Sequence, residues 1–183
     1  MAYKEKQIHN RRNGQTFRFL QTAADTNGAL LEMESTFREH SKEPPAHYHP
    51  SQDEHFTVLS GELTVRLGRR VYRLKQGEEL HIPRRQVHSM WNAGSEKAVV
   101  NWKVRPALQT EHMLENFAGL ANEGKTNENG VPNLLQTALL ARHFSGVFRL
   151  ARPSLAVQQT VFFVLAPFAR LLGYRGSYRK YID

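Results

Sequence analysis

The first half of the chain alternates apolar and polar positions with a period of two, which is typical of β-strands that bury one face. The alternation is clear over 16–21 and again over 31–37, and the turn-forming residues Asp25, Asn27 and Gly28 lie between these two segments. The pattern predicts that the two segments pair as a β-hairpin.

More short strands follow, each bounded by glycine or proline. Pro44 and Pro45 interrupt the chain, because proline cannot donate a hydrogen bond to a strand ladder. Strands are then predicted over 54–61, 63–67, 72–74, 88–92 and 100–102, and residues 77–83 are expected to form a turn that leads into another strand before His88. Short strands at this spacing favour a β-sandwich or a barrel.

Beyond Pro106 the apolar positions recur with the period of helices. Three helices are predicted, over 111–121 after an N-cap at Thr110, from Pro132 to near Gly146, and from Pro153 to Gly173. We therefore expect residues 1–105 to form a β-barrel with N-terminal strands, and residues 106–183 to form a C-terminal helical extension.

Composition narrows the class of protein. A chain of 183 residues can bury one sizeable core and an appendage, but it is short for two full domains. It has no cysteine, which excludes disulfides and thiolate ligands. Its polar beginning lacks the apolar segment of a secretory signal, so we expect a cytoplasmic protein.

Two stretches of the barrel region carry the candidate chemistry. His47 and His49 are one residue apart, so in an extended strand they project from the same face and can chelate one ion. Glu54 follows after a short loop, and His88 begins a later strand. Three imidazoles and one carboxylate suit a divalent transition metal, so the sequence predicts that these four side chains converge on one ion.

Together with nearby glycines and a proline, these residues resemble the two motifs of the cupin superfamily. The first motif is matched by His47, His49, Glu54 and Gly61, and the second by Gly77, Pro83, His88 and Asn92. One position departs, because Arg85 stands where the family usually has glycine. The resemblance covers roughly residues 17–104. It implies a mainly β fold, the double-stranded β-helix or jelly-roll cupin barrel, here with a C-terminal α-helical appendage.

A metal-free barrel is the alternative. A pair of histidines one residue apart is more often a polar strand face or a solvated loop, and cupins that have lost their metal commonly keep the barrel. The presence of all four expected ligands favours metal binding. The other histidines lack such partners and are expected to be surface or packing residues: His9, His40, His55, His81, His112 and His143.

The resemblance implies metal-dependent small-molecule chemistry without selecting the reaction. Cupins with this ligand set include dioxygenases, oxalate-processing enzymes and isomerases, and the set accepts manganese, iron, nickel or zinc. We expect a dioxygenase-like oxidoreductase. A cupin module that binds or senses a small molecule without turning it over is the alternative, because no second acid or base with convincing placement accompanies the ligands.

A substrate pocket is predicted beside the metal. Its lining residues are expected to be Phe56, Val58, Met90, Trp102 and Arg85. The apolar side chains favour an aromatic or otherwise hydrophobic substrate. Arg84 and Arg85, on the turn before His88, would instead suit an anionic ligand at the pocket mouth, or they simply face solvent.

The third predicted helix contains the apolar run Val161-Phe-Phe-Val-Leu-Ala-Pro-Phe-Ala. A membrane span needs about 20 apolar residues, and two glutamines, Pro167 and Arg170 interrupt this one. Its large side chains are expected to be covered by the barrel, by the preceding helices or by another subunit: Phe162, Phe163, Leu165, Phe168, Leu171 and Leu172. Burial within a compact helical appendage is favoured.

Charge bears on the partners. The net charge is +8, and residues 131–183 carry seven Lys/Arg against the single acid Asp183. Contact with an anionic membrane surface is the less favoured interpretation, because such charge is more often a solvated face. Nucleic acid is not expected, because the basic residues are dispersed and no helix-turn-helix precedes the barrel. We expect a small-molecule ligand or substrate, and a homodimer.

Overall fold

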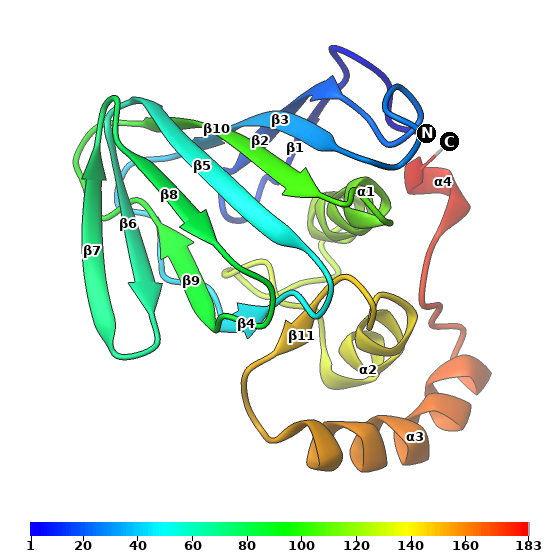
Figure 1. Cartoon of the computed structure of the whole chain (residues 1–183). Helices are drawn as coiled ribbons and strands as arrows, with labels where there is room; N and C mark the ends of the chain where they lie inside the picture. Colours follow the sequence, from blue (N-terminus) through cyan, green and yellow to red (C-terminus); the bar gives the residue numbers. More distant parts are fainter. Residues whose placement is uncertain (183) are drawn as a thin grey trace.

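Two antiparallel sheets face each other in the computed structural model, which describes residues 1–182 (Figure 1). The strands are β1 (Gln7–His9), β2 (Thr16–Gln21), β3 (Leu31–Phe37), β4 (His47–Tyr48), β5 (Asp53–Ser60), β6 (Glu62–Leu67), β7 (Arg70–Lys75), β8 (Glu79–Ile82), β9 (His88–Trp91), β10 (Ala98–Arg105) and β11 (Arg149–Leu150). One sheet has the order β1-β2-β3-β10-β5-β8, and the other has the order β11-β4-β9-β6-β7. The molecule is a jelly-roll β-sandwich with helices near its C-terminus, as the sequence predicts.

The alternation in the sequence accounts for the core between the sheets. In β3 every second residue is buried, from Leu31 to Phe37. In β5 the buried positions are Glu54, Phe56 and Val58, so the carboxylate of Glu54 shares the inward face with two apolar side chains. The strand period therefore turns Glu54 into the interior, between the two sheets.

The predicted hairpin over 16–21 and 31–37 is confirmed, because β2 and β3 pair as antiparallel neighbours. Its turn uses Asn27 and Gly28, both with positive φ, which these residue types tolerate best. The strands predicted between 54 and 102 correspond to β5 through β10.

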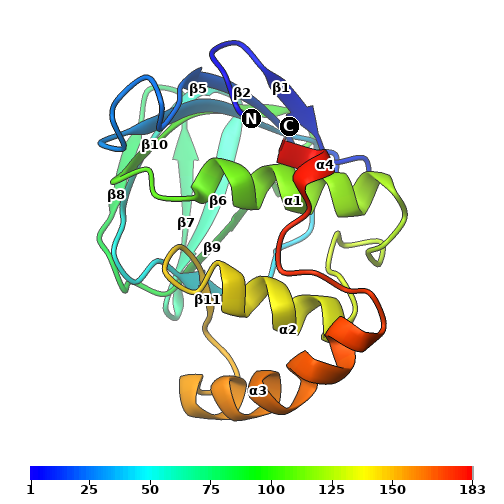
Figure 2. The same ribbon diagram turned by 90° about the vertical axis from the view of Figure 1, so that its right-hand side faces the viewer.

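Four helices follow the sandwich: α1 (Thr110–Asn122), α2 (Leu134–His143), α3 (Leu155–Leu171) and α4 (Arg179–Ile182). α1 lies beside the sandwich, and α2 lies next to α1. α3 lies on the far side of α2 (Figures 1 and 2). The chain then returns, so that α4 ends near α1 and the N-terminus (Figure 2). Leu114 of α1 belongs to the core of the sandwich, which joins the helices to the sheets.

The helix starts differ from the prediction. Thr110 is the first residue of α1 rather than its N-cap, and its hydroxyl accepts a hydrogen bond from the Gln52 side chain at 2.7 Å. Asn133 caps α2 with its side chain, so Pro132 lies outside that helix. α3 begins two residues after Pro153, which therefore also lies outside.

The C-terminal extension is not wholly helical. β11 pairs antiparallel with β4, with Arg149 opposite Tyr48 and Leu150 opposite His47. The Ala151 N–H also donates to the Ala46 carbonyl at 2.9 Å. A segment that the sequence pattern assigned to a helical tail thus extends one of the two sheets.

The outer helix also departs from expectation. Of its six large apolar side chains, Phe162 is buried and Leu165 is half-buried, but Phe163, Phe168, Leu171 and Leu172 are exposed. The prediction that the appendage buries them is therefore wrong for these four, because α3 packs only one face against α2 and nothing in residues 1–182 covers the other. Every helix in the described part of the chain is too short or too polar to cross a membrane.

Candidate metal centre

The four predicted ligands come from three strands in two sheets. In the second sheet β4 pairs with β9, and His47 lies directly opposite His88. His49 follows β4, and Glu54 approaches from β5 in the facing sheet. The site therefore lies between the sheets, where His49, Glu54 and His88 are each at most 3% exposed and His47 is partly exposed.

The side chains converge. One ring nitrogen from each of His47, His49 and His88 lies within 4.8 Å of the other two. Glu54 joins them, because its Oε2 lies 3.0 Å from Nε2 of His88 and its Oε1 lies 3.3 Å from Nε2 of His49. Two ligand atoms that are each about 2.1 Å from one ion are separated by roughly 3.0 to 4.2 Å. The observed separations are within about 1 Å of this range.

Hydrogen bonds fix the orientation of every imidazole. Nδ1 of His47 lies 3.2 Å from the Pro45 carbonyl oxygen, and Nδ1 of His88 lies 3.0 Å from that of Gln86. Nδ1 of His49 lies 2.6 Å from the Val147 carbonyl oxygen. A carbonyl oxygen only accepts, so each Nδ1 carries a proton and donates it.

This tautomer leaves Nε2 of each ring with its lone pair, and His88 and His49 direct that atom at Glu54. Nε2 of His49, Nε2 of His88 and Oε2 of Glu54 are buried and have no well-aligned hydrogen-bond partner in residues 1–182. Buried polar atoms in proteins are rarely left unpaired. A divalent transition metal would satisfy all three, so the residues present fit such an ion.

The electrostatics of the cluster agree with that fit. Loss of water, with His88 and His49 close by, holds the pKa of His47 well below its ordinary value. Burial also disfavours the charged form of His88, but the adjacent Glu54 carboxylate outweighs it and raises the pKa of His88. Burial acts to raise the pKa of Glu54, yet His49 and His88 lower it overall. Glu54 is therefore an anion, and His88 holds a proton more readily than His47.

Comparison with known proteins identifies the domain. Residues 33–103 match the family model described as the cupin domain. The chain contains a cupin domain. No curated protein matches the chain.

Solved structures similar to this chain include several cupins. KdgF from a Halomonas species is 16% identical, with a TM-score of 0.48 over 57% of this chain and 91% of that chain. An RmlC-like cupin from Shewanella frigidimarina is 18% identical, with a TM-score of 0.49 over 61% and 94%. A predicted oxalate decarboxylase from Thermotoga maritima is 19% identical, with a TM-score of 0.49 over 58% and 99%.

The cupin motif residues outside the ligand set shape turns. Gly61 has a φ of +73°, and a Cβ there would overlap the Lys97 carbonyl oxygen, so only glycine fits. Arg85 stands where the family usually has glycine, and it adopts a φ of +66°. The turn therefore keeps the left-handed geometry despite the substitution. The backbone N–H of Arg85 donates to the His49 carbonyl at 2.8 Å, next to the candidate metal centre.

Trp102 is part of the site. Its indole Nε1–H donates to Oε1 of Glu54 at 3.1 Å, and its ring stacks on Phe56 with centroids 5.4 Å apart. Phe56 and Val58 lie in the apolar core. The assignment of these residues, with Met90 and Arg85, to a substrate pocket stays a prediction.

The C-terminal segment contributes to the cupin site, which sequence analysis missed. The Val147 carbonyl holds His49, and the Phe148 ring lies with its centroid 4.8 Å from that of His47. β11 then pairs with β4 on the strand that carries His47. The signal was weak, because a two-residue strand between two helices leaves no periodic pattern. Only Gly146 marked a break there.

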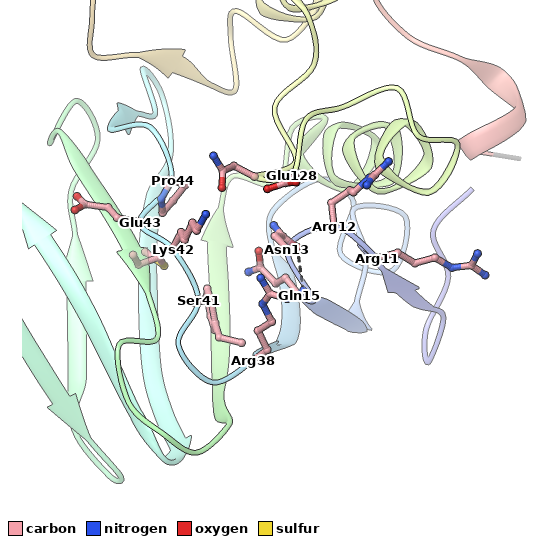
Figure 3. Close-up of a pocket in the computed structure, with 13 residues that line it drawn as sticks. Arg11, Arg12, Asn13, Gln15, Arg38, Ser41, Lys42, Glu43, Pro44 and Glu128 are labelled. Carbon is pink, nitrogen blue, oxygen red and sulfur yellow. Dashed lines mark hydrogen bonds between the residues drawn. The ribbon is translucent and has the colours of Figure 1, made fainter.

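A hollow of about 290 Å³ is lined by residues before β2, by the segment between β3 and β4 and by residues 128–129 (Figure 3). Its lining includes Arg11, Arg12, Arg38, Lys42 and Glu128, and we call it the cationic hollow. Within residues 1–182 none of the four cations forms an ion pair. Met90 also lines the hollow, and it follows His88 by two residues on β9, a distance of about 7 Å along a strand.

Proposed function

We propose that this cupin is a metal-dependent enzyme that oxidises a small molecule, in the manner of a dioxygenase. The ion would be one divalent transition metal, manganese, iron, nickel or zinc, held by His47, His49, Glu54 and His88. Of these four, zinc is not redox-active and would not support the oxidation. The observation that carries the proposal is the shared tautomer. All three rings donate Nδ1–H to a backbone carbonyl, so three Nε2 atoms are left for one ion.

A redox-active ion at this centre would supply Lewis acidity and a route for electrons to dioxygen. The chain's own residues do the rest. Trp102 holds Glu54 in place, and the Val147 carbonyl holds His49. Because His47 is the one ligand that stays partly exposed, a small molecule would approach the centre on its side.

The cationic hollow favours a substrate that carries an anionic group. Four cations line it without an ion-pair partner in the described chain. Of the two carboxylates that line it, Glu43 and Glu128, Glu43 already pairs with Arg66 at 2.7 Å and accepts a hydrogen bond from Ser89. A carboxylate or phosphate on the substrate would complete these charges. Met90 lines the hollow and lies two residues from His88 on β9, which supports a substrate that reaches from the hollow toward the metal centre.

A binding module that does not turn over its ligand is the second candidate. One observation favours it: Glu54 is the only buried carboxylate that the described sandwich strands contribute, and it already faces two imidazoles. The described sandwich strands therefore offer no second buried carboxylate for a reaction that needs a separate acid or base. An oxidation that the metal itself carries has no such requirement.

The test begins with elemental analysis of protein purified without added metal. The protein is then loaded with each of the four metals, and oxygen uptake is measured against phenolic and diketone compounds, each with and without a carboxylate. Oxygen uptake that depends on the metal and is faster with carboxylate-bearing compounds would support the proposal. Saturable ligand binding without oxygen uptake would establish the binding module, and a metal-free protein that binds none of the four ions would refute both.

A further inference from the structure

α3 has two contrasting faces. Its buried positions are Gln158, Phe162, Ala166 and Ala169, spaced three or four residues apart on the side toward α2. Even the polar member of this face is turned inward, because the Gln158 amide donates to the carbonyls of Leu150 and Pro153 at 2.9 and 2.7 Å.

The opposite side of the helix is exposed and largely apolar. We call it the outer apolar face, formed by Val157, Val161, Phe163, Val164, Phe168, Leu171 and Leu172. Leu171 is 84% exposed and Phe163 is 69% exposed. An ordinary surface helix carries polar residues on its outward side, and a contiguous apolar patch of this kind marks an interaction surface. α3 is the outermost element on this side of the molecule (Figures 1 and 2), so the face is open to a large partner.

The charges around this face have one sign. Residues 131–182 contain seven Lys/Arg and no Asp or Glu. Arg142, Arg152, Arg170 and Arg175 are exposed, and none of them lies within 4.0 Å of a carboxylate among the described residues. The Arg142 guanidinium lies 5.7 Å from the centroid of the Phe163 ring, so positive charge borders the apolar side chains directly.

These charges decide between two occupants. A second copy of the chain would bring an equally basic region against this one, with no carboxylate from residues 131–182 to neutralise it. An anionic lipid surface offers both complements, because acyl chains accept the apolar side chains and lipid phosphates or carboxylates accept the arginines.

We propose that the outer apolar face of α3 docks on an anionic membrane surface, with the helix lying in the plane of the interface. Phe163, Phe168 and Leu171 enter the boundary between headgroups and acyl chains. The surrounding arginines contact the lipid headgroups, and the sandwich with its metal centre stays in water. The sequence alone disfavours membrane contact, because such charge is more often a solvated face; here the charge borders an exposed apolar face.

The test uses the full chain and vesicles of two compositions, phosphatidylcholine alone and phosphatidylcholine with about one third phosphatidylserine. We expect co-sedimentation with the anionic vesicles, weakened by salt. The double variant Phe163→Ser, Leu171→Ser should lower the partition coefficient about 10-fold or more. The variant Arg142→Gln, Arg170→Gln should lower it by a similar factor for the anionic vesicles.

The matched control is Val71→Ser, Tyr72→Ser on β7, where both side chains are also exposed, at 48% and 40%. This variant should bind vesicles like the wild type. Circular dichroism of each variant checks that the fold is intact, which is expected because all substituted side chains lie at the surface.

Three outcomes would overturn the proposal. The first is that the wild type does not bind anionic vesicles, and the second is that it binds neutral and anionic vesicles equally. The third is that vesicle binding is absent and sedimentation velocity shows a dimer, which the variant Phe163→Ser, Leu171→Ser dissociates. The third outcome would assign the face to a second copy of the chain.

Discussion

The metal centre and the outer apolar face of α3 depart from ordinary protein structure in opposite directions. At the centre, charged and polar atoms are buried: Glu54 and His88 are each 1% exposed. On α3, large apolar side chains are exposed while the polar Gln158 is buried. Burying a charge without a partner and exposing a wide apolar patch are both unfavourable. For each region we therefore propose a complement from outside the chain, a cation at the centre and an anionic lipid surface at α3.

The two regions also differ in how the chain builds them. The centre joins residues from β4, β5, β9 and the segment before β11. Two of them, His49 and Val147, are hydrogen-bonded although they are 98 residues apart in the sequence. The face belongs to one helix of 17 residues. We therefore expect single substitutions at the centre to act on the whole site, whereas those on the face should have small and additive effects.

The largest expected effect is loss of metal. Replacing His88 by alanine removes one strong ligand and leaves Glu54 without its closest partner, so metal content should collapse. The fold should largely persist, because it rests on the apolar faces of the strands. Metal analysis and circular dichroism measure the two consequences separately. The same outcome is expected for His47→Ala.

His81 provides the control for this substitution. It is exposed on β8 in the sheet that carries Glu54, and His81→Ala should retain full metal content. If His88→Ala unfolds the protein, the metal has a structural role and the comparison with α3 no longer holds in the form given above.

A smaller effect on metal affinity is expected at Trp102, which contacts the ligand Glu54. Trp102→Phe keeps an aromatic ring against Phe56 but removes the hydrogen bond from Nε1 to Glu54. Residues that orient metal ligands in this way typically contribute about 10- to 100-fold to affinity, so we expect a weakening within that range. Isothermal titration with Zn²⁺ measures it.

Trp91→Phe is the matched control, because Trp91 also lies on a strand of the sandwich but its ring packs against Arg66 instead. It should leave the metal affinity unchanged. Equal losses in both variants would mean that the Trp102 effect comes from general destabilisation and not from Glu54.

Much of the centre could be predicted from the sequence, because each ligand lies in a strand or directly beside one. The strand period places His47 and His49 on one face, and it places Glu54 in register with Phe56 and Val58. Pairing of β4 with β9 then brings His88 opposite His47. The groups that orient the ligands could not be predicted from the sequence. They are the backbone carbonyls of Pro45, Gln86 and Val147, and every residue type has a backbone carbonyl.

The tail could be predicted less well, because a helix sequence gives its faces but not what covers them. The apolar positions of α3 were identified, and the buried stripe through Phe162 follows the helical period. The prediction that Phe163 and Leu171 are also buried rested on the cost of exposing them, and that cost indicates a partner without saying whether the same chain supplies it. β11 was missed because two residues are too few for a period.

Metal binding at the centre should depend on pH, unlike lipid binding by α3. Glu54 raises the pKa of His88, so protons compete with the metal for this ring at pH values where an ordinary histidine is already neutral. The apparent metal affinity should be constant above the pKa of His88 and fall by up to about tenfold per pH unit below it. His47 has a pKa held well below the ordinary value and adds to the loss only in stronger acid.

Calorimetric titration in buffers of different ionisation enthalpy counts the protons released. We expect about one proton on metal binding below the His88 pKa and none well above it. Vesicle binding by α3 should not follow this profile, because its arginines remain charged throughout. Proton release that does not change as the pH falls would contradict the assignment of the proton to His88.

The smallest expected effect distinguishes two neighbouring residues of α3. Phe162 is 7% exposed and faces α2, whereas Phe163 is 69% exposed on the outer apolar face. Replacing a buried phenylalanine by alanine typically costs about 3–5 kcal/mol, so Phe162→Ala should clearly lower the free energy of unfolding. Phe163→Ala should change it by no more than about 0.5 kcal/mol, as for other surface substitutions, and should leave the metal affinity unchanged. Urea denaturation of the isolated protein, repeated at several protein concentrations, tests both. If Phe163→Ala were as costly as Phe162→Ala, and its cost grew with protein concentration, the face would be buried in a dimer and would not be presented to a lipid surface.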